Sequence, residues 1–228
     1  IIDDVLAAQG NDGYLNTWYV FEKSGARFTE MGGSHELFNA GHLMQAAIAH
    51  YRTTGETAFL DGMCRYADYL CDVFDPWRPE SSSGHNGLEP ALVELYRATG
   101  TAKYLDLVRF LLEWDGFRER QDIHGHCVRT TYRCCGATDY FLETGDKACR
   151  ESIDRQWLDM TAHKIHLHGG IGSRFLHEDF GFPYQLPTRH TYAETCAAIG
   201  NIHWNARLLA VDGEAVYADL MERVLYNG

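Results

Sequence analysis

Three side chains in the second half of the sequence combine residue types that suit metal-assisted chemistry. Glu194 and Cys196 stand two residues apart in the segment Tyr-Ala-Glu-Thr-Cys-Ala, and Glu178 precedes them. Zinc, a borderline-soft cation, accepts both carboxylate oxygen and thiolate sulfur. A separate carboxyl group nearby suits proton transfer to a leaving group. We therefore take Glu194 and Cys196 as candidate metal ligands and Glu178 as the candidate general acid and base.

This pair of ligands sets a condition on the backbone. Residues i and i+2 of a helix face apart, so Glu194 and Cys196 converge on one ion only if their segment is extended or just enters a helix. The apolar run 197–209 predicts that a helix begins near this point, and a helix N-terminus favours a thiolate. A zinc site takes about four ligands, so the others must come from elsewhere.

Histidine follows glycine at three places that could surround a cleft. The pairs are Gly41-His42, Gly84-His85 and Gly125-His126. Each pair is expected just before the first helix of a helical hairpin, and Glu194 occupies the matching place of a fourth hairpin. Equivalent positions in a repeat would direct three imidazoles into one cleft, with glycine permitting a close approach. The alternative is that these histidines cap helices or bond loop carbonyls.

The hairpins themselves are predicted from a recurring glycine. Gly55, Gly100, Gly145 and Gly213 each stand between two segments of helical periodicity, which is where the left-handed cap of a helix belongs. The first two intervals are 45 residues and the third is 68, so the third carries an insertion. Repeated helical hairpins of this length form an open solenoid or a closed toroid. We expect an all-α, (α/α)6-type toroid, incomplete in this chain.

The insertion contains the least regular part of the sequence. A short strand is expected at 164–168, followed by a Gly- and Pro-containing loop that carries Glu178. Long irregular segments in compact helical domains are often functional. His163, His166 and His168 resemble a metal cluster, but a structural role is favoured. Packing is likewise favoured for Cys134-Cys135, and the Pro- and Ser-rich stretch 76–84 is expected to link hairpins.

Composition excludes several partners. The net charge of −12 over 228 residues disfavours binding to nucleic acid. No apolar run approaches the ~20 residues of a membrane span, and no secretory signal is visible, although the chain starts at Ile1 and looks trimmed there. The seven cysteines, an odd number set mostly in helical patterns, argue for a reducing compartment, so a cytoplasmic location is expected.

Taken together and in order, short motifs along nearly the whole chain resemble those of the bacterial β-L-arabinofuranosidases, retaining glycoside hydrolases with a zinc-bound cysteine nucleophile. The motifs are Asp-Gly-Tyr-Leu-Asn-Thr at 12–17, His-Glu-Leu at 35–37, Ala-Gly-His-Leu at 40–43, Gly-His at 84–85 and 125–126, Gly-Gly-Ile-Gly-Ser at 169–173, Tyr-Ala-Glu-Thr-Cys-Ala at 192–197, Met-Glu-Arg at 221–223 and Tyr-Asn-Gly at 226–228.

The resemblance implies a fold, a cofactor and a substrate. It implies an (α/α)6 catalytic barrel occupying residues 1–228 as one domain, with Zn²⁺ on Glu194 and Cys196 and with Glu178 as the general acid and base. It also implies that the sugar, an L-arabinofuranoside, is held by side chains at four positions, and a homodimer is kept open as an assembly. Those substrate-binding candidates are His42, His85, His126 and Thr195.

One departure from the family pattern limits the prediction. The family's nucleophile belongs to a Cys-Cys-Pro sequence well downstream of Tyr-Asn-Gly, and this chain ends before such a sequence, as it does before the family's β-sandwich domains. The chain is therefore expected to be the N-terminal part of such an enzyme. Two alternatives remain: a metal-free lyase, epimerase or uronyl hydrolase on the same ring of helices, and a non-catalytic toroid that binds a glycan or a partner.

Overall fold

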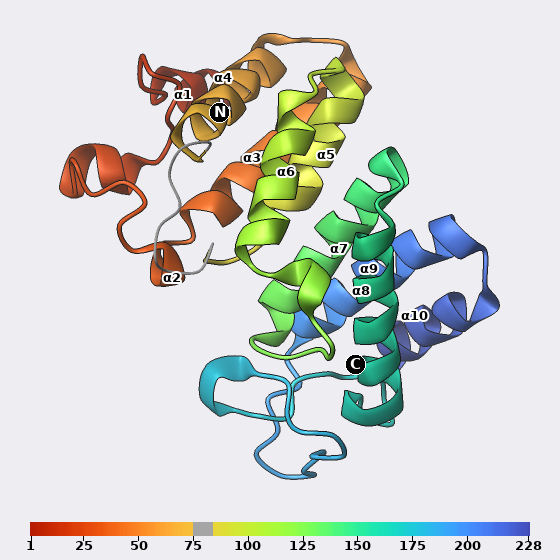
Figure 1. Ribbon diagram of the computed structural model, residues 1–228. Helices are drawn as coiled ribbons and strands as arrows, with labels where there is room; N and C mark the ends of the chain where they lie inside the picture. Colours follow the sequence, from red (N-terminus) through yellow and green to blue (C-terminus); the bar gives the residue numbers. More distant parts are fainter. Residues whose placement is uncertain (75–83) are drawn as a thin grey trace. The chain divides into compact units, whose positions relative to one another are not determined.

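The computed structural model describes residues 1–74 and 84–228, and every helix or strand assigned in these segments is a helix (Figure 1). The expected Pro- and Ser-rich link at 76–84 falls, apart from Gly84, outside the described residues. The chain divides into two compact units, Ile1–Asp115 and Gly116–Gly228. The single-domain organisation stays a prediction.

The first unit is built on two helical hairpins. Its first hairpin pairs α3 with α4, its second pairs α5 with α6, and α3 packs along α5. The core between them is apolar and closed to solvent, with Met44, Ile48 and Leu92 fully buried. The elements are α1 (Ile2–Ala7), the π-helix η1 (Trp18–Glu22), α2 (Met31–Ser34), α3 (Glu36–Thr54), α4 (Ala58–Phe74), α5 (Leu88–Thr99) and α6 (Lys103–Trp114).

The second unit repeats this plan. Helix α7 pairs with α8, α9 pairs with α10, and α7 packs along α9 around the buried Trp204. The insertion predicted from the glycine spacing lies between α8 and α9 (Figure 1). The elements are η2 (Phe117–Glu119), α7 (Cys127–Thr144), α8 (Lys147–Asp159), the π-helix η3 (Met160–Lys164), η4 (Leu176–Glu178), α9 (Thr195–Asp212) and α10 (Ala215–Asn227).

The four predicted glycine caps are confirmed. Gly55, Gly100, Gly145 and Gly213 follow α3, α5, α7 and α9 with φ between 70° and 76°. In each case the glycine N–H donates to the carbonyl four residues earlier, at 2.7–2.8 Å. No described atom lies within 4 Å of where a Cβ would stand, so the left-handed backbone, and not crowding, selects glycine there.

The all-α class is confirmed, but the expected strand at 164–168 is wrong. Residues 160–164 continue from α8 as a π-helix, and the only pairing of this stretch is a single bridge between Ile165 and Ile171. The amine of Lys164 explains this, because it is buried against Asp159 at 2.8 Å and the carbonyl of Ile123 at 2.7 Å. That contact holds the end of α8 in helical form. Among the described residues, no helix is both long enough and apolar enough to cross a membrane.

Candidate active site

Two sequence-predicted residues begin the two helices that pack together in the second unit. His126 is the N-cap of α7, and its Nδ1 accepts a hydrogen bond from the N–H of Val128 at 3.2 Å. Glu194 is the N-cap of α9, in extended conformation. Because α7 and α9 lie side by side, their N-terminal ends can share one site. The predicted equivalence of His126 and Glu194 in the repeat therefore has a structural basis.

Glu178 reaches this site from the insertion. It ends η4 with φ 57°, after His177 at φ 66°, so two consecutive non-glycine residues occupy the left-handed region. Backbone hydrogen bonds hold the turn in place: Arg174 and Asp179 pair with each other, and the N–H of Phe180 donates to the carbonyl of Gly125 at 3.0 Å. The carboxylate of Glu178 then lies 2.8 Å from Nε2 of His126. Strain of this kind persists only where surrounding contacts enforce it.

The carboxylate of Glu194 and the thiol of Cys196 face each other. Glu194 is extended while Cys196 lies in the first turn of α9, which meets the condition derived from their spacing. The neighbouring Glu194 carboxylate, together with burial, raises the pKa of the Cys196 thiol. Among the described residues, no group of three or more His, Cys, Asp or Glu side chains is arranged to hold a metal ion. Glu194 and Cys196 are thus a pair of candidate ligands and not a complete site.

Tyr192 is hydrogen-bonded to one of the two carboxylates, and sequence reasoning missed it. Its hydroxyl donates to Oε2 of Glu194. Burial and the carboxylates of Glu194 and Glu178 raise the pKa of Tyr192 far above its ordinary value. A clue was present in the sequence, because a tyrosine two residues from a candidate ligand offers a hydroxyl on the same extended segment. Thr195, the remaining candidate here, is the exposed first residue of α9.

The other two histidines belong to the first unit, and the expectation that each precedes a helix is wrong for His42. Helix α3 starts at Glu36, so His42 lies inside it, whereas His85 precedes α5. The helix starts early because the buried Glu36 carboxylate accepts hydrogen bonds from Tyr14 and from the N–H of Phe28. That the three imidazoles share one cleft stays a prediction.

His42 and His85 contact the same aromatic ring. The ring of Phe38 lies edge-on to both, with centroid distances of 4.3 Å to His42 and 4.2 Å to His85. His42 also lines a cleft of about 630 Å³ with Asn16 and Asn39. In this unit the predicted sugar-binding histidine therefore lines an open cavity, whose walls are more apolar than polar.

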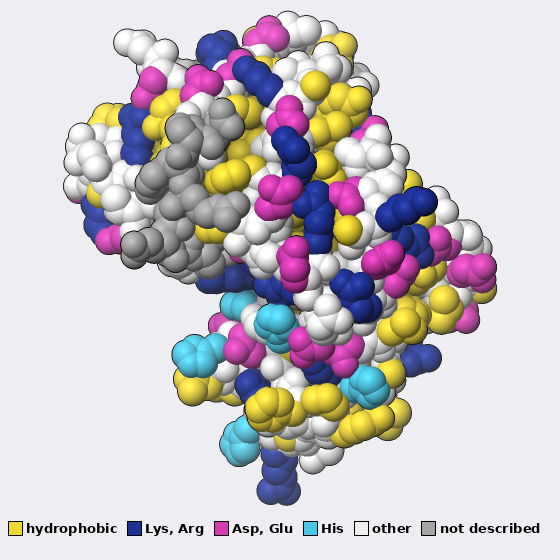
Figure 2. Space-filling view, in the orientation of Figure 1, with side chains coloured by type: hydrophobic (Ala, Val, Ile, Leu, Met, Phe, Trp, Pro, Cys, Tyr) yellow, Lys and Arg dark blue, Asp and Glu magenta, His cyan; other side chains and the backbone are white. Residues whose placement is uncertain are grey.

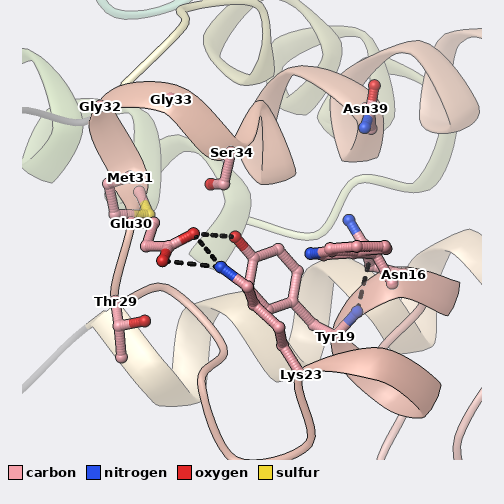
Figure 3. A pocket seen from close by; sticks show the side chains of 11 residues that line it. Asn16, Tyr19, Lys23, Thr29, Glu30, Met31, Gly32, Gly33, Ser34 and Asn39 are labelled. Atoms are coloured by element: carbon pink, nitrogen blue, oxygen red, sulfur yellow. Dashed lines mark hydrogen bonds and ion pairs between the residues drawn. The ribbon is translucent and has the colours of Figure 1, made fainter.

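A second cleft in the first unit, of about 850 Å³, shares Asn16 and Asn39 with the first. Figure 3 shows its side chains: Lys23 and the Tyr19 hydroxyl point to the carboxylate of Glu30. Lys23 bonds both carboxylate oxygens at 2.8 Å, and Tyr19 reaches one at 3.4 Å. These contacts place a charged pair and a phenol along one wall of the cleft.

The insertion exposes large apolar side chains beside the loop that carries Glu178. Figure 2 shows hydrophobic and histidine side chains close together in this part of the second unit. Arg174 stacks over the ring of Phe182 at 4.3 Å. Surfaces with several exposed rings are unusual unless something binds there. The side chains, each 70–73% exposed, are Phe175, Leu176, Phe182 and Tyr184.

The residues predicted to be structural have structural contacts. Cys134 and Cys135 are buried in α7. His163 bonds Asp159 at 2.9 Å, and the rings of His166 and His168 stack on one another. Within the described part of the chain, neither the cysteine pair nor these histidines belong to a group of three or more side chains that could hold a metal ion.

Comparison with known proteins connects this geometry to a family of carbohydrate-active enzymes. The family model described as "Beta-L-arabinofuranosidase, GH127 catalytic domain" matches residues 1–228. A non-reducing end β-L-arabinofuranosidase of Bifidobacterium longum subsp. longum is 29% identical, and the match covers all of this chain and 41% of the relative. The chain belongs to the GH127 β-L-arabinofuranosidase catalytic-domain family.

Two solved structures share the fold. A GH127 β-L-arabinofuranosidase from Geobacillus stearothermophilus T6 is 35% identical with a TM-score of 0.92, covering 99% of this chain and 41% of that one. A second GH127 β-arabinofuranosidase is 38% identical with the same TM-score, covering 99% of this chain and 39% of that one. The chain thus spans about two fifths of the length of these relatives.

Proposed function

We propose that this chain carries the acid/base residue and two metal ligands of a retaining β-L-arabinofuranosidase that releases terminal L-arabinofuranose. The observation that carries the proposal lies in the second unit, where Glu178 is paired with His126 at the start of α7, and Glu194, bonded by the Tyr192 hydroxyl, stands with Cys196 at the start of the neighbouring α9. Membership of the GH127 family and the names of the relatives support the substrate class.

Zinc is the proposed cofactor, because the facing carboxylate and thiol of Glu194 and Cys196 match its ligand preference. When bound, the ion would keep coordinated thiols ionised at neutral pH. Glu194 and Cys196 would supply two of about four ligands. The remaining ligands, including the cysteine nucleophile that the family resemblance implies, would come from outside this chain.

Glu178 would protonate the departing glycosidic oxygen and, in the second half of the reaction, take a proton from water. Its position suits this role, because the carboxylate is half exposed and because His126 orients it without enclosing it. His42, His85, His126 and Thr195 would bond sugar hydroxyls. We also propose a reducing, cytoplasmic location, since all seven cysteines are free thiols.

The test uses the protein with its complete chain. The wild type should release L-arabinose with retained configuration and contain zinc. For Glu178→Gln we expect turnover to fall roughly 10²- to 10⁴-fold on substrates with poor leaving groups, which need an acid, and less on activated aryl glycosides. Zinc content, measured by inductively coupled plasma mass spectrometry, should be unchanged. Cys196→Ser should instead lower the zinc content.

Glu151→Gln provides a matched control, because Glu151 is an exposed glutamate on α8 of the same unit. It should leave both turnover and zinc unchanged. Undiminished hydrolysis of poor leaving groups by the Glu178 variant would rule out its role as the acid. A wild-type protein that holds no zinc but cleaves or epimerises uronic-acid glycans would support the metal-free alternative. Glycan binding without product release would support a non-catalytic toroid.

A further inference from the structure

A cleft of about 490 Å³ lies within the insertion of the second unit. Its walls combine apolar side chains, among them Phe175 and Pro187, with the side chains of Arg174 and Arg189. Sites for small molecules typically have a volume of this size and a mostly apolar lining with a few charged groups. The cleft therefore suits a small molecule that has an apolar body and a negative charge.

The charges around the cleft are unbalanced in favour of cations. Among the described residues, no carboxylate is ion-paired with Arg174 or Arg189. Acidic partners are abundant, since the chain has 32 Asp and Glu against 20 Lys and Arg. Of the described residues that line the cleft, one, Asp179, is acidic. The cleft therefore attracts anions in a protein that is acidic as a whole. Three other arginines of the unit are each bonded to an aspartate: Arg118, Arg150 and Arg207.

Arg174 is held in place by its neighbours in the insertion. Its guanidinium stacks over the ring of Phe182 at 4.3 Å, and its Nε donates to Oε1 of Gln185 at 3.4 Å. The same oxygen of Gln185 accepts a hydrogen bond from the N–H of Phe182 at 3.0 Å. These contacts use the face and the Nε of the guanidinium, so its two terminal nitrogens remain for a ligand. A planar guanidinium fixed in this way can bind a carboxylate through two hydrogen bonds.

The cleft is built on the turn that carries the candidate acid and base. His177 and Asp179, the chain neighbours of Glu178, both line it. Two backbone hydrogen bonds between Arg174 and Asp179, at 3.1 and 3.2 Å, close this turn. In glycoside hydrolysis the acid protonates the oxygen of the departing group, so that group must lie beside the acid. A cleft that shares the turn of Glu178 is therefore suitably placed for it.

We propose that this cleft is the subsite for the leaving group and that it favours an aglycone with a carboxylate. Arg174 and Arg189 would bind the carboxylate, and the apolar walls would contact the body of the aglycone. This inference rests on the proposed function, since a leaving group exists only if a glycoside is cleaved. It adds selection for negative charge on the side of the scissile bond opposite the arabinose.

The test compares two substrates in the complete protein, the β-L-arabinofuranosides of para-carboxybenzyl alcohol and of para-carbamoylbenzyl alcohol. The two aglycones have the same size, and the methylene between ring and oxygen gives them nearly the same leaving ability. We expect the wild type to have a kcat/KM about tenfold higher for the carboxylate, mainly through KM, as one charge-assisted contact can supply. The preference should shrink at high salt.

Arg189→Gln should remove most of this preference, and Arg189→Glu should invert it. Arg189 is exposed, so both variants should fold. Lys147→Gln is the matched control, because it removes the same unit of charge from an exposed side chain of the same unit. Lys147 begins α8, whereas the insertion follows the other end of that helix. The control should keep the full preference for the carboxylate.

Binding of the free alcohols, measured by NMR titration, gives a readout without catalysis. The wild type should bind para-(hydroxymethyl)benzoate about tenfold more tightly than the corresponding amide, and Arg189→Gln should bind the two about equally. If the wild type cleaves neither glycoside but keeps this difference in binding, the proposed function fails and the anion preference of the cleft stands. Equal kcat/KM of the wild type for both glycosides would overturn the inference, as would an equal loss on both in Arg189→Gln.

Discussion

Both units place glutamates near the starts of helices, but they use them differently. In the first unit, Glu36 begins α3 and Glu89 lies in the first turn of α5, and each is only 1% exposed. In the second unit, Glu194 precedes α9 and Glu178 comes from the insertion, and the side chain of Glu178 is 45% exposed. Glutamate thus occurs in a closed setting, buried from solvent, in the first unit and in an open setting, partly exposed to solvent, in the second.

The partners of these carboxylates differ as well. Glu36 accepts hydrogen bonds from the Tyr14 hydroxyl at 2.5 Å, the Phe28 N–H at 2.9 Å and the Ser34 hydroxyl at 3.2 Å. The acceptor positions of the Glu36 carboxylate are therefore largely occupied by groups of the protein itself.

In the second unit, Glu178 is paired with the His126 imidazole, and Glu194 accepts a hydrogen bond from the Tyr192 hydroxyl. A buried carboxylate that joins loops to a helix is structural, whereas one that stays partly exposed to solvent is available for chemistry.

The largest loss of stability should come from removing the buried Glu36 carboxylate. Glu36→Ala would leave the Phe28 N–H and the Tyr14 hydroxyl buried without their acceptor, at roughly 1–3 kcal/mol for each group. We expect the free energy of unfolding, measured by urea denaturation, to fall by about 3 kcal/mol. Glu178→Ala, in the open setting, should cost less than about 1 kcal/mol.

Glu36→Gln is the control within this comparison, because it preserves one acceptor oxygen and the side-chain volume. It should recover more than half of the stability that Glu36→Ala loses. Equal losses for the alanine variants of Glu36 and Glu178 would show that enclosure does not distinguish the two carboxylates.

The glycines of the Gly-His pairs extend the comparison, because close packing requires glycine at position 41 and a left-handed backbone favours it at position 125. Gly41 lies inside α3, where a Cβ would stand 2.3 Å from the carbonyl oxygen of Gly87, so Gly41→Ala must displace backbone. We expect a loss of about 2–3 kcal/mol. Gly125 has φ 84° and no described atom closer than 3.8 Å to a Cβ, so Gly125→Ala should cost about 1 kcal/mol from backbone strain alone.

Gly62→Ala separates crowding from helix propensity. Gly62 is also inside a helix, and a Cβ there would also meet an atom at 2.3 Å, but that atom is the flexible end of the Leu6 side chain. Alanine favours helix by about 1 kcal/mol over glycine, which should offset the small rearrangement. Thermal unfolding of the three variants checks the order, and a Gly62→Ala loss as large as that of Gly41→Ala would contradict it.

The repeated helical hairpins were predictable because the sequence features that specify them are local. A glycine between two periodic segments determines a cap, and Gly55, Gly100, Gly145 and Gly213 all formed one. The meeting of Glu194 with Cys196 was predictable for the same reason, as it depends only on where α9 begins.

Long-range contacts were not predictable in this way. The early start of α3 depends on Glu36 meeting Tyr14 and Phe28, which lie outside the helix. The helical form of 160–164 depends on Lys164 reaching Ile123, and the pairing of Glu178 with His126 depends on the insertion folding back to the start of α7. None of these partners lies within the window over which a periodic pattern is read.

The smallest expected effect on stability concerns the ion pairs that connect the hairpins within each unit. In the second unit, Arg150 of α8 bonds both oxygens of Asp212 at the end of α9, at 2.9 and 2.8 Å, and holds the pKa of Asp212 below its usual range. In the first unit, Arg52 of α3 reaches Glu94 of α5 by a single, more exposed contact at 3.4 Å. Bidentate pairs are the stronger kind.

Asp212→Asn should therefore lower the free energy of unfolding by about 1 kcal/mol at pH 7, and Glu94→Gln by less than about 0.5 kcal/mol. Because the folded-state pKa of Asp212 is lowered, its contribution is complete above the ordinary pKa of about 4 and disappears as pH falls through the folded value. Urea unfolding of the wild type and Asp212→Asn should thus differ at pH 7, and the difference should shrink as the pH falls below the ordinary pKa of about 4. A difference that persists undiminished at low pH would mean that Asp212 stabilises the unit through packing and not through its charge.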